Sequence, residues 1–156
     1  MTLNNKLVVS ASPHDRTHST TRSIMLDVII ALIPSLIASV VFFGPRALLV
    51  EAVAVGTCVI AEYVSRVFMK RHQTIGDLSA VITGLLLAFN LPVNVPLWMV
   101  MLGSVIAIVV VKQFFGGIGQ NFVNPAMTAR IILMVSFPTA MAKWVVPYAN
   151  PWHADA

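Results

Sequence analysis

The sequence is organised by long apolar runs, and the first of them limits what the chain can fold into. From Ser23 to Phe43 the only charged residue is Asp27, and the run ends at Gly44 and Pro45. A second run of similar length extends from about Arg46 to Phe68. At about 1.5 Å per residue, a helix of either length crosses a hydrocarbon core about 30 Å thick. We therefore predict an all-α fold, a polytopic transmembrane helical bundle.

Composition supports this prediction and excludes other classes. Hydrophobic residues make up 58% of the chain, charged residues make up 10%, and the mean hydropathy is +0.86. A soluble domain has about 25% charged residues, and this chain has too little polar surface to cover an apolar core. The net charge of +4 comes from clustered Lys and Arg, which indicates topology and not nucleic-acid binding. Cys58 is the only cysteine, which excludes a disulfide framework and a cysteine-ligated iron–sulfur cluster.

Three shorter apolar runs follow, and they predict short or broken helices. These runs are Leu78 to Leu91, Val95 to Val111 and Ala126 to Phe137. We expect about five membrane segments within residues 23–138. The pair His14 and His18 lacks the neighbouring Glu of a helical zinc site, so no metal site is predicted.

The distribution of basic residues predicts the orientation in the membrane. The exit of the second run is strongly basic, with Arg66 in its last residues and Lys70, Arg71 and His72 after it, and basic loops face the cytoplasm. This places residues 1–22 in the cytoplasm and residues 139–156, with their Trp and Tyr, at the outer interface. The expected location is the bacterial cytoplasmic (inner) membrane.

The segment from Lys112 to Arg130 interrupts the apolar pattern with polar residues and glycines. Its glycines are Gly116, Gly117 and Gly119. Glycine permits positive φ, Pro125 favours the first turn of a new helix, and Asn124 is placed to cap that helix. Membrane helices break only where the freed backbone groups meet protein, ligand or water, so the break is a candidate binding site or ion path. Close helix packing around small residues is the alternative.

Ionisable residues inside the apolar runs are the next candidates. A charge at the bilayer centre is unfavourable by about 2.5 to 3.5 kcal/mol, so it faces protein or water unless it reaches the headgroups. Asp27, Glu51 and Glu62 lie near the ends of runs, where they reach headgroups or serve an ion path. Arg130 lies deeper, which predicts a structural ion pair or a role toward a ligand or ion. Asp77 suits a helix N-terminus. We assign Asp77, Glu51 and Arg130 as candidates for an ion pathway or buried charge.

Three motifs carry a resemblance to a known family. They are SPHDRTHSTTRSIMLDVIIALIPSLIASVVFFG, GDLSAVITGLLLAFNLPVNVPLW and KQFFGGIGQNFVNPAMTAR. Together they resemble the D subunits of Rnf ion-translocating ferredoxin:NAD oxidoreductases, to which the B subunits of sodium-translocating NADH:quinone oxidoreductases are similar. The resemblance covers nearly all of the chain.

The resemblance implies a membrane subunit that couples electron transfer between ferredoxin and NAD, through flavins, to transport of Na⁺ or H⁺. Family members carry FMN joined through its phosphate to a threonine of a Ser-x-Ala-Thr motif, and some also hold riboflavin between their helices. No such motif occurs in this chain, which looks like the N-terminal half of a longer subunit. Its implied partners are the other subunits of the complex and the lipid bilayer.

For the flavin, the residue types of the break suggest candidates, and no catalytic residue is predicted. A flavin ring needs amide-like donors and acceptors and an apolar bed, which Gly116, Gly117, Asn121 and Asn124 can supply in part. Two other functions remain open: a small transporter or channel that binds its solute at the break, and a purely structural membrane subunit.

Overall fold

A computed structural model describes residues 20–73 and 75–148, and these form helices and connecting loops without a strand. The helices are α1 (Thr21–Phe43), α2 (Pro45–Phe68), the 3₁₀ turn η1 (Ile75–Asp77), α3 (Ser79–Phe89), α4 (Leu97–Val105), the π-helical segment η2 (Ile106–Gln113), α5 (Pro125–Ser136) and α6 (Pro138–Met141). This confirms the all-α prediction, and the five apolar runs correspond to α1, α2, α3, α4 with η2, and α5. The histidines of HDRTH lie outside the described residues.

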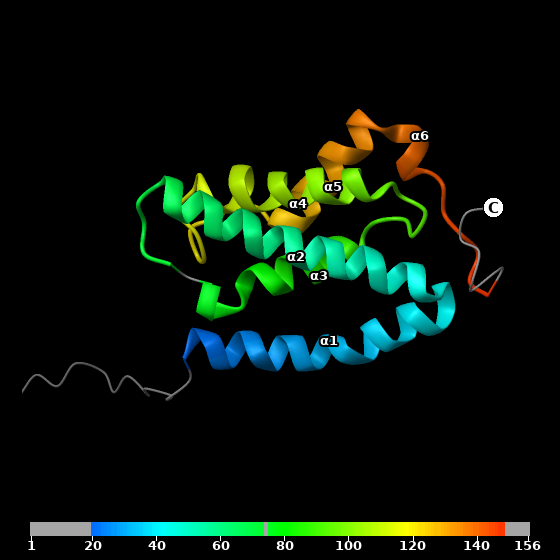
Figure 1. The fold of residues 1–156 in the computed structure, drawn as a ribbon, viewed down its shortest axis with the longest axis horizontal. Helices are drawn as coiled ribbons and strands as arrows, with labels where there is room; N and C mark the ends of the chain where they lie inside the picture. The colour runs from blue at the N-terminus through cyan, green and yellow to red at the C-terminus, as the bar shows by residue number, and fades with distance from the viewer. Residues whose placement is uncertain (1–19, 74, 149–156) are drawn as a thin grey trace, which may run out of the picture.

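The long elements run back and forth along one axis (Figure 1). We call one end of the bundle the Gly44 end: it contains Gly44, the α3–α4 loop (90–96) and α6. The opposite end, called the glycine-loop end, contains the α2–α3 connection and the loop 114–124. Each apolar helix therefore extends from one end toward the other.

Local sequence signals explain where the helices begin. Thr20 caps α1, because its hydroxyl accepts a hydrogen bond from the Ser23 backbone N–H at 3.2 Å. Gly44, at φ 78°, turns the chain from α1 to α2, and Pro45 occupies the first position of α2. Asn124 and Pro125 begin α5 in the predicted way, since Asn124 Oδ1 accepts from the Ala126 N–H at 3.0 Å.

α2 is the central helix, and small residues on its buried face let neighbours approach. Ala54 and Cys58 are fully buried there. Across from them, a Cβ added to Gly84 of α3 would lie 2.7 Å from the Val55 Cα. Such backbone contact through small residues is typical of helices packed within membranes.

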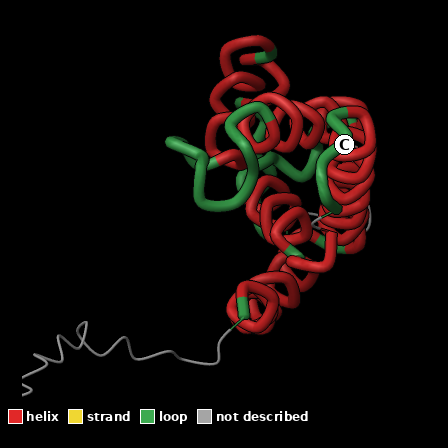
Figure 2. The backbone as a smooth tube through the Cα atoms, turned by 90° about the vertical axis from the view of Figure 1, so that its left-hand side faces the viewer, coloured by secondary structure: helices red, strands yellow, loops and turns green. Residues whose placement is uncertain are grey.

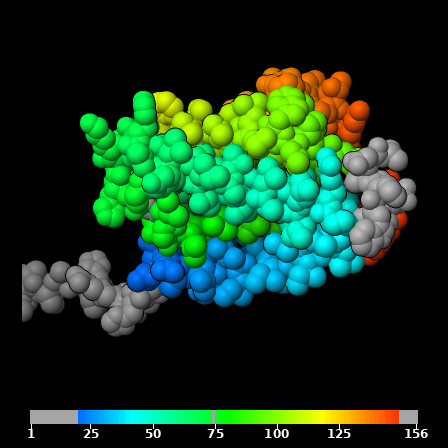
Figure 3. All heavy atoms as spheres, viewed as in Figure 1, coloured from blue at the N-terminus to red at the C-terminus, as the bar shows by residue number. Residues whose placement is uncertain are grey.

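The outer surface is apolar, as expected for a membrane bundle. An 18-residue window of α1 has a mean hydropathy of 2.5, the helix has no buried residue, and it lies at the edge of the bundle (Figure 2). α2 crosses the face shown in Figure 3 and carries exposed Val64 and Phe68. Both helices are long enough to cross a membrane. Large apolar patches of this kind would be unfavourable in water, as is typical of membrane and interaction surfaces.

Candidate functional site

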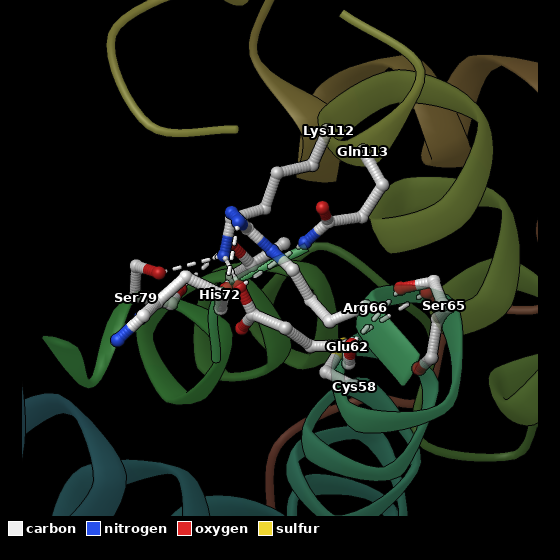
Figure 4. Close-up of polar contacts among 10 residues, drawn as sticks. Cys58, Glu62, Ser65, Arg66, His72, Ser79, Lys112 and Gln113 are labelled. Carbon is white, nitrogen blue, oxygen red and sulfur yellow. Dashed lines mark hydrogen bonds and ion pairs between the residues drawn. The ribbon is translucent and has the colours of Figure 1, made fainter. Parts of the chain in front are cut away.

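A buried cluster of charged and amide side chains lies near the glycine-loop end (Figure 4). Lys112 Nζ is 2.9 Å from Glu62 Oε1 and 2.6 Å from Ser79 Oγ. Gln113 Nε2 donates to the same Glu62 oxygen at 3.2 Å. The Lys112 and Glu62 side chains are 2% and 0% exposed, so the pair lies inside the protein.

Three elements position these groups. Glu62 belongs to the buried face of α2, Ser79 begins α3, and Lys112 with Gln113 ends the π-helical segment η2. The wider turn of a π-helix lets Lys112 and Gln113, adjacent in sequence, both contact Glu62. The wide turn continues beyond η2, where the Gly117 N–H donates to the Lys112 carbonyl at 3.0 Å. Single π-helical turns occur frequently at functional sites.

Two arginines close this end of the cluster. Arg66 Nη1 donates to the His72 carbonyl at 3.1 Å, and Arg71 Nη1 donates to the Gln113 carbonyl at 3.1 Å. Arg66 lies in the last turn of α2, inside the predicted second run, but it is 7% exposed and does not extend into the basic loop that follows. Its alkyl chain and guanidinium pack inward because Gly117, which has no Cβ, leaves room beside Nη2.

The oxygen atoms around the Lys112 ammonium group are of the kind that also bind small cations. The Lys112 ammonium is surrounded by oxygen from Glu62 and Ser79, and Gln113 Oε1 is a further buried oxygen without a hydrogen-bond partner in the described part of the chain. A small cation that replaced the ammonium would therefore meet several oxygen ligands. A buried ion pair adds little net stability over an apolar substitute, so its presence favours a functional reason.

The glycines of the break have the positive φ that was predicted for them, and the hydrogen bonds of Asn121 and Asn124 are made within the loop and the adjoining helix ends. Gly116 and Gly117 have φ of 109° and 105°. In its hydrogen-bonding orientation, the Asn121 amide donates to the Lys112 and Gly117 carbonyls, both at 3.2 Å. Asn124 caps α5. These contacts hold the glycine loop against the end of η2, directly beside the charged cluster.

The other predicted charges do not join this cluster. Asp77 ends η1 and is half-buried, and Leu78, at φ 59°, separates it from α3. Glu51 is 4% exposed near the Gly44 end, where its Oε1 is 2.5 Å from Ser39 Oγ. The headgroup interpretation is wrong for Glu51 and Glu62, since both face protein, whereas Asp27 is exposed on α1.

Arg130 has neutral partners. Its Nη1 donates to Asn90 Oδ1 at 3.1 Å, and its guanidinium lies 5.9 Å from the centre of the Trp144 ring. The partners that the described residues give Arg130 are an amide and an aromatic ring, so the ion pair stays a prediction. An amide oxygen and an aromatic face stabilise the cation.

The Lys112–Glu62 pair was missed because the sequence does not reveal how helices pair. Lys112 was assigned to a loop, and Glu62 was considered alone. A signal was available: both residues lie toward the ends of apolar runs that the basic loops place on the same side of the membrane, and their charges are opposite.

Fold and cluster together define a class: a helical membrane protein with a buried ion pair at a break between helices. Comparison with known proteins narrows the class. Residues 8–156 match the profile of the NQR2, RnfD, RnfE family, and the chain belongs to that family.

Named relatives agree with this membership. The chain is 51% identical over 137 residues to the D subunit of the Na⁺-translocating ferredoxin:NAD⁺ oxidoreductase complex of Acetobacterium woodii, covering 88% of this chain and 43% of the relative. It is 44% identical over 143 residues to the D subunit of the ion-translocating oxidoreductase complex of Yersinia enterocolitica, covering 89% and 40%. With the corresponding protein of Salmonella newport the identity is 41%, covering 90% and 40%. The chain thus spans about two fifths of the length of these relatives.

Proposed function

We propose that this chain is part of a membrane subunit of a redox-driven, cation-translocating electron transport complex. The observation that carries the proposal is the Lys112–Glu62 pair, buried at a helix break inside an apolar bundle. In such a complex, a change in the charge of a nearby electron carrier alters the affinity of a carboxylate for a cation, and a competing ammonium gives that carboxylate two states. Family membership and the names of the relatives support electron transfer as the energy source.

Orientation and location follow from charge. The glycine-loop end carries Lys70 and Arg71, which are exposed beside the buried Arg66. Basic loops favour the cytoplasmic side, so this end faces the cytoplasm of a bacterial inner membrane. In that orientation the N-terminus is cytoplasmic, and the Glu62 cluster lies on the side from which cations are taken up.

The loop residues provide part of what a flavin-binding site requires, on one side of the flavin ring. Phe115 and Phe122 pack edge to face, with ring centres 4.8 Å apart, and their exposed surfaces form an apolar bed. Asn124 uses its oxygen to cap α5, and its amide N–H₂ is available to donate. An enclosing wall is not formed by the described residues. We propose that Gly116, Gly117, Asn121 and Asn124 border a riboflavin or FMN site whose remainder comes from other protein; the flavin would supply electron transfer.

A covalent FMN is proposed for the full-length subunit, on a threonine outside this chain. The partners would be the other subunits of the complex, and lipid would cover α1. No residue of this chain is proposed as catalytic.

The experiment that tests the function uses the complete complex in proteoliposomes. Ferredoxin-driven reduction of NAD⁺ should be accompanied by cation uptake, and the purified complex should show flavin absorption. A colourless complex that moves a solute without redox chemistry would indicate the transporter alternative. A complex with full redox and transport activity after removal of this subunit would indicate a structural role.

A further inference from the structure

A cavity of about 180 Å³ lies at the Gly44 end, far from the Glu62 cluster. Side chains of α1, α2, the α3–α4 loop and the segment after α6 line it, among them Ser39, Val50, Glu51, Leu91 and Trp144. Glu51 supplies its carboxyl group from the second turn of α2, which begins at Pro45 directly after Gly44. The lining is otherwise almost entirely apolar.

Glu51 is buried there with an incomplete set of partners. Its side chain is 4% exposed, and Oε1 contacts Ser39 Oγ at 2.5 Å. Oε2 is buried and has no hydrogen-bond partner in residues 20–73 and 75–148. A carboxylate without compensation is strongly unfavourable in such surroundings, so the group needs a positive partner.

The contacts of Ser39 indicate what that partner is. Ser39 Oγ lies 2.8 Å from the Leu36 carbonyl oxygen and 2.5 Å from Glu51 Oε1. A hydroxyl has one proton to donate and can also accept. Because the hydroxyl has one proton, each contact is a full hydrogen bond when Ser39 donates to Leu36 and a protonated Glu51 donates to Ser39. We propose that Glu51 and Ser39 form a proton-binding site at the Gly44 end of the bundle.

A metal cation fits the cavity less well. Hard cations in proteins take about six oxygen ligands. The side chains that line this cavity offer the two carboxyl oxygens of Glu51 and the hydroxyl of Ser39. One proton satisfies the same carboxyl without further ligands.

The cations on the surrounding elements are the other possible partners of the Glu51 carboxyl group. They are Arg46 of α2, Arg130 of α5 and Lys143 after α6. Arg130 contacts Asn90 and Trp144. Within residues 20–73 and 75–148, the side-chain hydrogen bond of Glu51 is with Ser39, and its Oε2 has no hydrogen-bond partner. Glu51 is also the only acid among the residues that line the cavity.

Glu51 and Glu62 share the buried face of α2. At about 1.5 Å per residue, a separation of eleven positions places the two acids about 16 Å apart along the helix axis. A proton-binding acid at one end and an ion pair at the other would give the bundle one titratable group for each side of the membrane. This transport role rests on the proposed function, whereas proton binding by Glu51 does not.

Infrared difference spectroscopy of the intact complex tests the site directly. A protonated carboxyl gives a C=O band that is separate from the bands of carboxylates and amides. We expect one such band at neutral pH, lost in Glu51→Gln and retained in Asp27→Asn, which removes an exposed acid from α1. Ser39→Ala should keep the band and shift it, because the hydrogen-bond acceptor is gone, and this variant tests the site if Glu51→Gln does not assemble.

Three results would overturn the proposal. In the first, Glu51→Gln assembles and loses no carboxyl band. In the second, Ser39→Ala leaves every carboxyl band unshifted. In the third, the band is replaced by a carboxylate band when KCl is exchanged for NaCl, which would mean that a metal cation occupies the site. None of these results depends on electron transfer, so the proton site and the proposed function fail separately.

Discussion

Lys112 and Glu62, 50 residues apart in the sequence, form an ion pair of 2.9 Å that joins η2 to α2 inside the bundle. The pair holds the break between η2 and α5 against the central helix. Both side chains are buried, and each compensates the charge of the other. In the proposed function this compensation makes the pair a switch between two charge states, and it also makes the pair a point at which the fold is vulnerable.

The first prediction concerns the energetic coupling of the pair. Lys112→Met or Glu62→Met alone leaves a buried charge and should destabilise the subunit by about 3 to 5 kcal/mol. The double variant removes both charges and should recover most of that loss. The measurement is thermal stability of the purified complex in detergent. Equal losses for the double variant and for the sum of the single variants would contradict the coupling.

The second prediction concerns the contact between α2 and α3. Gly84→Ala places a Cβ 2.7 Å from the Val55 Cα, so the helices must separate, and we expect a loss of about 1 to 3 kcal/mol. Gly56→Ala is the matched control, because a Cβ at Gly56 of α2 meets nothing within 4 Å. Gly56→Ala should be neutral or stabilising, since alanine favours helix. A loss at Gly56 as large as at Gly84 would argue against close packing as the cause.

The third prediction concerns the glycine loop. Gly117→Val is strained at φ 105° by about 1 to 3 kcal/mol and also displaces the Arg66 guanidinium from its place. Gly119→Val meets the same backbone strain at φ 81° without a neighbour within 4 Å of its Cβ. Assembly yields should fall in the order Gly76→Val, Gly119→Val, Gly117→Val, because Gly76 has neither constraint. Similar yields for Gly117→Val and Gly119→Val would show that Arg66 does not need its present position.

The fourth prediction concerns Arg130. Arg130→Leu removes the hydrogen bond to Asn90 and the contact with Trp144 and should reduce stability by about 1.5 to 3 kcal/mol. Arg130→Lys keeps the charge but loses the planar guanidinium, so we expect an intermediate loss. Asn90→Ala combined with Arg130→Leu should be less than additive. Wild-type stability of Arg130→Leu would mean that the side chain reaches the headgroups instead.

The fifth prediction concerns topology. Cysteine at Gln73 should react with a membrane-impermeant thiol reagent only from the cytoplasm, and cysteine at Lys143 only from outside. Both positions are exposed, whereas the native Cys58 is fully buried and should remain unlabelled. Reversed labelling would invert the assignment of the two ends.

The helices could be predicted from the sequence because the length of an apolar run and the presence of helix-capping residues are local signals. The boundaries of α1, α2 and α5 follow from Gly44, Pro45 and the Asn124-Pro125 pair, each of which acts on its own neighbours. The positive φ of Gly116 and Gly117 followed from the same local logic.

The candidate site was less predictable because it depends on how helices pair. A π-helical turn aims Lys112 at Glu62, and no local residue pattern specified that turn. For Arg130 a structural ion pair or a role toward a ligand or ion was predicted, and the contacts that the structure gives it are with Asn90 of the α3–α4 loop and Trp144 after α6. Contacts between helices therefore determine where the charged side chains lie, whereas local residue types determine the backbone conformation of the glycine loop.

In the proposed function, the Lys112–Glu62 pair couples electron transfer to cation movement. The double variant Lys112→Met/Glu62→Met removes both charges of the pair, so neither Lys112 nor Glu62 is left buried without the other, and the complex should assemble. The most direct measurement is the number of cations taken up per electron by the complete complex in proteoliposomes. The account predicts that the double variant still reduces NAD⁺ with ferredoxin but that cation uptake per electron falls to near zero. Unchanged uptake per electron in the assembled double variant would contradict it.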